Sequence, residues 1–232
     1  MKEKFTNFIL VLLFPKFCFG CQKEGSYLCE DCQAILEISG FHQPYRTSHL
    51  TDLYFALNYQ KPLIKNLIKL FKYEPFVKDL SKTLSSLILS HFRCLENSPE
   101  FILEHFQLLD NKPNYSDFVL FPVPLERSRL KWRGFNQAEE IAREISSFLK
   151  IPLVLDCLVK TKETLPQVEL AKETRKENIK GVFSCFCPEK IKGRKILLVD
   201  DVFTTGATLE EAAKVLKTAG AKEIIGLVVA RG

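Results

Sequence analysis

The sequence lacks both of the glycine-rich motifs that most often mark a nucleotide site. Its 232 residues contain no G-x-x-x-x-G-K-[ST] loop and no G-x-G-x-x-G turn, so that no motif indicates a P-loop NTPase or a Rossmann dinucleotide domain. Internal repeats and low-complexity tracts are also absent. Because 46% of the residues are hydrophobic, we expect a globular protein, long enough for one core and an appendage.

A membrane-spanning run is missing as well. The apolar run near the N-terminus, 8–14, has seven residues, whereas a transmembrane helix needs about 20. No small-residue cleavage site follows this run, because Pro15 and Lys16 come next. We therefore expect the run to pack on the body of a cytoplasmic protein that does not insert into a membrane.

Charge of one sign does not dominate the chain. It has 33 basic and 28 acidic residues, a formal net charge of +5, which by itself is no nucleic-acid signature. Histidine is scarce, and all four histidines lie outside the motifs described below, so that no general base can be assigned. They are His42, His49, His91 and His105.

Residues 196–208 carry most of the functional information. Ile196 to Val199 are apolar and predict a buried parallel strand. The adjacent carboxylates Asp200 and Asp201 follow at the expected end of this strand. Ligands of open α/β sheets bind at the carboxyl ends of strands, and two neighbouring carboxylates can accept hydrogen bonds from the vicinal hydroxyls of a ribose.

A small, hydroxyl-rich turn comes next and opens a helix. It consists of Thr204, Thr205, Gly206, Ala207 and Thr208. Free backbone N–H groups and the positive end of the helix dipole suit a phosphate there, and Gly206 lets the backbone approach the ligand. The pattern D-D-x-x-T-T-G-x-T after an apolar strand resembles the phosphoribosyl pyrophosphate (PRPP) motif of type I phosphoribosyltransferases. The alternative is a plain strand end and an ordinary helix cap.

Four of the eight cysteines form two C-x2-C pairs separated by seven residues. Such pairs bring four thiolates within reach of one tetrahedral Zn²⁺, whereas a disulfide scaffold would call for a secretory signal. We expect a closed, structural zinc site with Gly20 and Gly25 in its tight turns. Its ligands are Cys18, Cys21, Cys29 and Cys32. The other four cysteines, Cys94, Cys157, Cys185 and Cys187, stand apart, and we interpret the Cys185-x-Cys187 pair as packing or surface thiols.

The order of the other segments predicts an α/β fold. Beyond residue 118, expected strands alternate with expected helices, which favours a parallel sheet with helices on both faces. We expect a zinc-finger module at 1–45 and a phosphoribosyltransferase-like domain at 46–232, in which 50–117 forms a helical hood or linker and 118–232 the core sheet. The expected core strands are 118–121, 153–160, 196–199 and 224–230. The expected helices are 136–150 and the helix that the turn at 204–208 opens, which runs to Gly220.

Residues 50–95 have a helical pattern, clearest at 62–72, where the lysines lie opposite the apolar residues. We interpret Lys65, Lys69 and Lys72 as a solvated face, with a phosphate or nucleic-acid contact as the alternative. The polar segment 161–181 is too long for a simple connection. In a transferase it would close over the substrate and exclude water, and Arg175 would then reach the pyrophosphate.

Basic residues follow the expected strand at 118–121. In the assumed sheet they lie at the same edge as Asp200, where the arginine fork suits pyrophosphate oxygens; the alternative is a solvated basic loop. These residues are Arg127, Arg129, Lys131 and Arg133. Among them, Trp132 either stacks on a base or covers the loop, and Asn136 is the expected N-cap of the next helix.

The whole chain resembles the ComF family of phosphoribosyltransferase-like proteins. The resemblance rests on the cysteine pairs at 18–32, the region 59–72, P-V-P-L at 122–125, R-G-F-N-Q-A at 133–138 and the loop at 200–208. It implies a zinc finger fused to a PRPP-binding domain, and a role in handling single-stranded DNA during natural transformation, with a competence helicase as a partner. Lys160 stands where the family usually carries arginine, which keeps the charge but loses a bidentate contact.

As a transferase, the protein would displace pyrophosphate at the anomeric carbon of PRPP. Asp200 and Asp201 would hold the ribose hydroxyls, directly or through Mg²⁺, and 204–208 would hold the 5′-phosphate. No residue identifies the acceptor, whose hood we expect to come from the N-terminal half of the chain. Two other functions stay open: a non-catalytic PRPP sensor, and a protein that binds single-stranded DNA.

Overall fold

The computed structural model describes residues 15–40, 42–96, 107–109, 112–114, 117–162 and 178–232. Its centre is a four-stranded sheet in which every pairing is parallel. The strands, in their order across the sheet, are β1 (Asp52–Asn58), β8 (Glu223–Arg231), β7 (Lys195–Phe203) and β4 (Phe118–Pro122). The predicted parallel α/β sheet is therefore confirmed.

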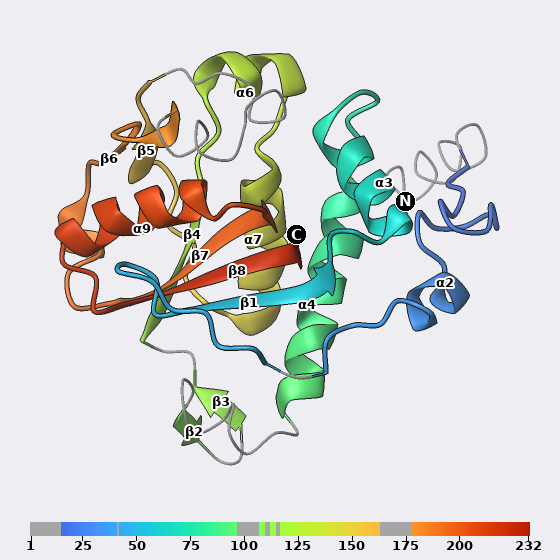
Figure 1. The fold of residues 1–232 in the computed structure, drawn as a ribbon, viewed down its shortest axis with the longest axis horizontal. Helices are drawn as coiled ribbons and strands as arrows, with labels where there is room; N and C mark the ends of the chain where they lie inside the picture. The colour runs from blue at the N-terminus through green and yellow to red at the C-terminus, as the bar shows by residue number, and fades with distance from the viewer. Residues whose placement is uncertain (1–14, 41, 97–106, 110–111, 115–116, 163–177) are drawn as a thin grey trace, which may run out of the picture.

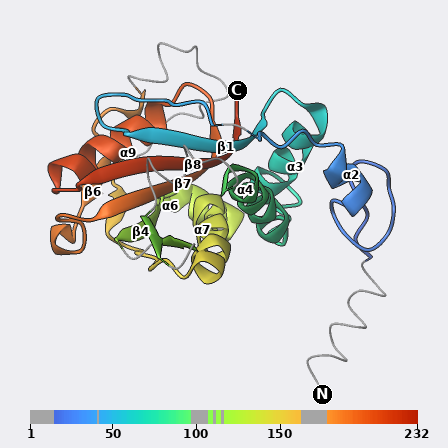
Figure 2. The same cartoon turned by 90° about the horizontal axis from the view of Figure 1, so that it is seen from below.

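Helices cover both faces of this sheet, as predicted (Figures 1 and 2). The three long ones are α4 (Leu80–Glu96), α7 (Gln137–Leu149) and α9 (Ala207–Thr218). In β7, Leu197 and Val199 belong to the core shared with α4 and α7, whereas Ile196 and Leu198 belong to the core shared with α9. This alternation is what a strand buried on both faces requires.

The helix ends follow from local chemistry. The Asn136 side chain accepts a hydrogen bond from the Ala138 N–H at 3.1 Å and so caps α7, which confirms the predicted N-cap. At the end of α9, Gly220 has a φ of 96°. The N–H groups of Gly220 and Ala221 donate to the carbonyls of Lys217 and Leu216, which is a Schellman ending.

Three expectations about the strands need correction. The helical prediction for 50–95 is wrong over Asp52–Asn58, which is the sheet strand β1, so that the sheet is not confined to 118–232. Strand β7 does not end before the acid pair but runs on to Phe203. The expected strand 153–160 is divided: Leu153 makes a single parallel bridge to Leu120, and only β5 (Leu158–Lys160) is a strand.

Two small antiparallel hairpins lie outside the main sheet. One pairs β2 (Gln107–Leu109) with β3 (Lys112–Asn114). The other pairs β5 with β6 (Phe183–Cys185), which contacts α9 and is followed by the short helix η2 (Pro188–Lys190). The β5–β6 hairpin therefore stands beside the helix that the predicted phosphate loop opens (Figure 1).

The N-terminal module contains the short helix α2 (Glu30–Ala34) and packs on α3 (Pro62–Lys72). Cys18, Leu28 and Cys32 are buried in the same core as Leu67 and Phe71 of α3. Helix α3 thus joins the cysteine module at one end of the molecule to the edge of the sheet (Figure 2). In the part of the chain described above, no helix is long and apolar enough to cross a membrane.

Candidate PRPP site

The acid pair lies in β7, near the carboxyl end of the central strands. Because successive strand residues point to opposite faces, Asp201 faces the α3 side and Asp200 the α9 side. Asp201 is buried, and its Oδ1 lies 2.7 Å from Nζ of Lys72, the last residue of α3. The interpretation of Lys72 as part of a solvated face is therefore wrong: only 26% of its side chain is exposed.

This pairing sets the electrostatics of the site. Desolvation, together with the neighbouring charge of Asp201, raises the pKa of Asp200 to about 7, although Lys72 and the Asp201 N–H oppose the shift. That N–H donates to Asp200 Oδ1 at 2.9 Å. For Lys72, desolvation lowers the pKa but the two aspartates outweigh it, so that its pKa is raised and it stays charged. Asp200 thus has a pKa close to neutral pH, and the cation that acts on it, Lys72, keeps its charge.

The predicted phosphate loop is the turn between β7 and α9, and its position 206 accepts only glycine. Gly206, the N-cap of α9, has a φ of 77°. A Cβ built on Gly206 would lie 2.5 Å from Cζ of the buried Phe203 ring. The loop therefore needs glycine both for its backbone conformation and for the space. Thr204 is exposed and Thr205 and Thr208 are half-buried, so that these hydroxyls border the helix N-terminus.

The four basic residues after β4 form a helix, α6 (Arg127–Arg133), rather than the loop that the sequence suggested. The helix sorts them into two rows of i, i+4 spacing. Arg127 and Lys131 are exposed, whereas Arg129 and Arg133 are half-buried. The alternative interpretation, a solvated basic run, therefore holds only for the outer row, Arg127 and Lys131.

Arg133 is held in place and still has a donor to offer. Its guanidinium donates to Oε1 of Gln137 at 3.0 Å and lies over the Tyr73 ring, 5.6 Å from its centroid. Desolvation lowers the pKa of Arg133, while the charge of Asp201 opposes that shift. Among the described residues, no partner accepts from the buried Nε of Arg133. Such an unpaired donor near the acid pair fits an anionic oxygen of a ligand.

Arg129 and Lys160 converge on a second buried carboxylate, that of Glu126. Nε of Arg129 and Nζ of Lys160 each lie 3.8 Å from Oε2 of Glu126. The Lys160 side chain is only 8% exposed. Desolvation, reinforced by the charge of Arg129, lowers the pKa of Lys160 to about 8. The basic end of β5 therefore belongs to the same charge network as α6.

Two residues of the site were not assigned to it from the sequence. The lysine spacing of 62–72 predicts a solvated position for Lys72, and Gln137 stands in the R-G-F-N-Q-A motif without a residue type that indicates its role. Gln137 is buried and donates through Nε2 to the Phe71 carbonyl at 2.9 Å. It thereby connects Arg133 to the end of α3, one residue before Lys72. The only sequence signal was its position directly after the N-cap Asn136.

Two cavities lie at the phosphate loop and at α6, and Asp200 and Asp201 line neither of them. One of about 520 Å³ is lined by Thr205, Gly206 and Ala207 on one side and by Tyr45 and Thr47 on the other. The second, of about 680 Å³, is lined by residues of α6, β5 and the 122–126 turn, among them Lys160. Residues before β1 thus form a wall of the first cavity, as a hood from the N-terminal half would.

Trp132 is 56% exposed and stands edge-on to Phe76, with the ring centroids 4.9 Å apart. It therefore does not lie in the core, and the described residues leave more than half of its surface exposed. Of the other predicted residues, Arg175 falls in 163–177 and lies outside the described residues. The same holds for the apolar run at 8–14.

The four cysteines of the two C-x2-C pairs come together, as the spacing predicted. Their Sγ atoms all lie within 4.8 Å of one another. The N–H groups of Cys29 and Gly20 donate to Cys18 Sγ at 3.3 and 3.4 Å. Burial alone would raise the pKa of this thiol, but these donors, together with hydrogen bonds from the Cys21 backbone and the Cys32 side chain, lower it to about 6, which favours the thiolate that binds metals. A Cβ on Gly20 would lie 2.6 Å from Cys32 Sγ. The cluster can hold a tetrahedral metal ion.

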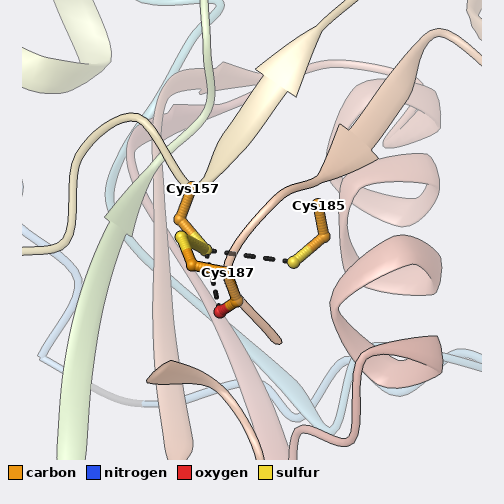
Figure 3. Close-up of a disulfide and its surroundings, with 3 residues drawn as sticks. All are labelled: Cys157, Cys185 and Cys187. Atoms are coloured by element: carbon orange, nitrogen blue, oxygen red, sulfur yellow. Dashed lines mark hydrogen bonds between the residues drawn. A yellow bond between two sulfur atoms is a disulfide. The ribbon is translucent and has the colours of Figure 1, made fainter. Parts of the chain in front are cut away.

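The remaining cysteines correct another expectation. Cys157, Cys185 and Cys187 do not stand apart but meet where β5 and β6 pair (Figure 3). Cys157 and Cys187 form a disulfide, and Sγ of Cys185 lies 3.9 Å from Sγ of Cys157. No spacing rule could have indicated this cluster, because it requires the hairpin to be formed first.

Comparison with known proteins places the site in a family context. Residues 131–232 match the model of the phosphoribosyl transferase domain, which includes the acid pair and the phosphate loop. Over 107 residues the chain is 37% identical to Competence protein F of Haemophilus influenzae, covering 46% of this chain and 47% of that one. It is 35% identical over 102 residues to the DNA utilization protein YhgH of Escherichia coli K12, covering 44% of each.

Competence protein ComFC of Streptococcus pneumoniae is 33% identical over 111 residues, which are 47% of this chain and 46% of that one. The matched regions thus span about half the length of these curated relatives. Among solved structures, a Bacillus subtilis glutamine PRPP amidotransferase matches 65% of this chain and 25% of its own, at 16% identity and a TM-score of 0.35. So low a score adds nothing to the argument from the sheet order and the family match.

Proposed function

Because this chain is a phosphoribosyltransferase-like protein of the ComF family, we propose that it binds PRPP with Mg²⁺ and transfers the phosphoribosyl group to an acceptor. The single observation that carries the proposal is the acid pair of β7 followed by the glycine-capped turn into α9. That combination offers carboxylates to a ribose and free N–H groups to a phosphate within one short segment.

The ribose and its phosphate have separate holders in this proposal. Asp200 and Asp201 accept hydrogen bonds from the ribose hydroxyls, and the turn Thr204–Thr208 binds the 5′-phosphate through backbone N–H groups and hydroxyls. Lys72 neutralises Asp201 while no substrate is bound. When the substrate arrives, its hydroxyls compete for the same carboxylate oxygen, so that binding and the Lys72–Asp201 contact are coupled.

The pyrophosphate faces the half-buried row of α6, which consists of Arg129 and Arg133. Arg133, with its unpaired Nε, and Arg129 neutralise the departing charge, while Arg127 and Lys131 form the outer approach. Mg²⁺, for which carboxylate and phosphate oxygens are the usual ligands, supplies further neutralisation of the pyrophosphate when bound. Positive charge developing on the ribose ring is stabilised by the carboxylate of Asp200. Arg175 is proposed to reach the pyrophosphate from 161–181.

The cysteine cluster is proposed to bind a structural Zn²⁺. Its four soft thiolate donors fill a tetrahedral coordination sphere and leave no open position for chemistry. The module packs on α3, whose last residue is Lys72, and so the metal acts on the PRPP site only by ordering this helix. We also propose that the chain consists of two structural units, residues 1–45 and residues 46–232. We propose further that the protein is located in the cytoplasm.

A second function is favoured by the surface around Trp132. An exposed indole beside the cations of α6 is the arrangement that stacks a base and neutralises its phosphates. In this alternative the protein binds single-stranded DNA, in line with the names of its relatives, senses PRPP without turnover, and acts with a competence helicase. The acid pair argues for the transferase, because carboxylates beside a nucleic-acid strand repel it.

The two functions are separated by one paired experiment. The protein is mixed with PRPP, Mg²⁺ and candidate acceptors (bases, nucleotides, oligonucleotides), and pyrophosphate release is measured beside the Asp200→Ala/Asp201→Ala variant. Release that depends on the aspartates supports the transferase. The binding function is correct instead if no acceptor gives pyrophosphate release and a fluorescent single-stranded oligonucleotide binds. In that case Trp132→Ala and Arg133→Ala should each weaken the binding of the oligonucleotide.

A further inference from the structure

The base of the β5–β6 hairpin gathers three sulfur atoms that the proposed function does not use. Cys157 directly precedes β5, Cys185 ends β6, and Cys187 follows two residues later. Backbone hydrogen bonding fixes their proximity, because Phe186 donates to the Cys157 carbonyl at 2.8 Å and Leu158 pairs in register with Cys185. The cluster is therefore built into the fold.

Cys157 is placed between two possible partners. It is bonded to Cys187, and the free thiol of Cys185 has its Sγ 3.9 Å from the Cys157 sulfur (Figure 3). Cys157 is buried, whereas Cys185 and Cys187 are half-buried and flank Phe186, which is 67% exposed. A disulfide with a third thiol beside it is the arrangement that exchanges, and its outer cysteines are the ones that a reagent reaches.

We propose that Cys157, Cys185 and Cys187 form a thiol–disulfide exchange site whose oxidation state controls the β5–β6 hairpin. The Cys185 thiolate attacks Cys157 Sγ, the Cys157–Cys185 bond forms, and the electron pair of the old bond leaves on Cys187 as its thiolate. Complete reduction requires a dithiol, which delivers two electrons and two protons to the protein and is itself oxidised to a disulfide.

The hairpin connects this site to the charge network of Glu126, Arg129 and Lys160. Lys160, the last residue of β5, lies 3.8 Å from Glu126, and Lys160 lines the larger cavity. The next residue, Thr161, donates to the Val182 carbonyl at 2.8 Å and so continues the pairing of the two strands by one hydrogen bond. On the other side, β6 contacts α9. Reduction removes the covalent link between Cys157 and Cys187 across the hairpin, so that Lys160 and Thr161 gain freedom.

The exchange is tested by mapping disulfides in the full-length protein, without any measurement of PRPP binding. Wild type, Cys185→Ser, Cys187→Ser and, as the matched control, Cys94→Ser on the exposed side of α4 are incubated with oxidised glutathione, quenched with iodoacetamide and digested without reduction. We expect Cys157–Cys187 in wild type, Cys94→Ser and Cys185→Ser. We expect Cys157–Cys185 in most molecules of Cys187→Ser, where a pairing with glutathione is resolved by Cys185.

The wild type alone also decides the matter if a variant does not fold. Hydrogen exchange of the amides in β5 and β6 should accelerate several-fold after treatment with a dithiol, while amides of α4 stay unchanged. The proposal is overturned if Cys157 and Cys187 are both alkylated after oxidation of the wild type, if Cys185 stays a free thiol in Cys187→Ser, or if a dithiol leaves β5 and β6 exchange unaltered. These outcomes are independent of whether the protein binds PRPP.

Discussion

Nζ of Lys72 lies 2.7 Å from Oδ1 of Asp201, although the two residues belong to opposite halves of the chain. Lys72 ends the helix on which the cysteine module packs, and Asp201 belongs to the acid pair of the candidate PRPP site. This contact makes the N-terminal half part of the site. The phosphoribosyl transferase domain match begins only at residue 131.

The first prediction concerns this pair. Lys72→Met should lower the free energy of unfolding by about 1–3 kcal/mol, because the buried Asp201 carboxylate loses its donor. It should also raise the pKa of Asp200 further. Lys69→Met, on the exposed side of the same helix, is the control and should leave the unfolding free energy within about 0.5 kcal/mol of wild type. Denaturant titrations measure the unfolding free energy of both variants. Equal effects of the two substitutions would contradict the role of Lys72 as the partner of Asp201.

The second prediction is a pH dependence of stability. Asp200 has its pKa raised from 3.8 to about 7 in the folded protein, so that between these values the folded state holds a proton that the unfolded state has released. Stability contributed by this group therefore falls as the pH rises from about 4 to about 7. The Asp200→Asn variant, which cannot ionise, lacks this slope. Unfolding curves at several pH values for both proteins provide the test, and parallel profiles would refute it.

The third prediction concerns the phosphate loop. Gly206→Ala must accept a left-handed φ and a contact of the new methyl with the Phe203 ring, which we expect to cost about 1–3 kcal/mol and to abolish PRPP binding. Gly193→Ala is the matched control, because Gly193 has a φ of 74° but nothing within 4 Å of its added Cβ. Only the conformational part should be lost there. If the two variants lose the same free energy of unfolding, the contact with Phe203 does not contribute to the cost of Gly206→Ala.

The fourth prediction is that zinc stabilises more than its own module. Removing the metal with a chelator, or replacing Cys18 by Ser, should unfold the packing of the module on α3 and lower the Tm. Each kcal/mol lost corresponds to about 2–4 °C for a chain of this size. Cys94→Ser should retain one bound zinc per chain and an unchanged Tm. Metal analysis with calorimetric melting measures both, and an unaltered Tm after complete zinc loss would contradict this coupling.

The parts of the fold that were predicted correctly have a local cause. The part of β7 from Ile196 to Val199, helix α9 and its ending at Gly220 follow from an apolar run, a glycine turn and a C′ glycine, all of which act within a few residues. The apolar stretch from Leu53 to Leu57 was misassigned because a short run without alternation suits a buried strand as well as a helix. Its parallel pairing with β8 decided the matter, and that pairing is not local.

The same distinction explains the site. Asp200, Asp201 and Gly206 stand in one motif, and the sequence indicated them together. Lys72 lay in a regular lysine stripe, and only the position of α3 against β7 removes it from solvent. Likewise, the meeting of Cys157 with Cys187 depends on the β5–β6 pairing. Contacts between distant segments were thus the part that residue patterns could not supply.

The most direct test of the central claim is titration calorimetry of the zinc-loaded protein with PRPP and Mg²⁺. The account predicts saturable binding by the wild type, its loss in Asp200→Ala/Asp201→Ala, and its retention in Glu189→Gln, a control on the exposed helix η2. Absence of binding by the wild type, or equal binding by the acid-pair variant, would contradict the assignment of this site to PRPP.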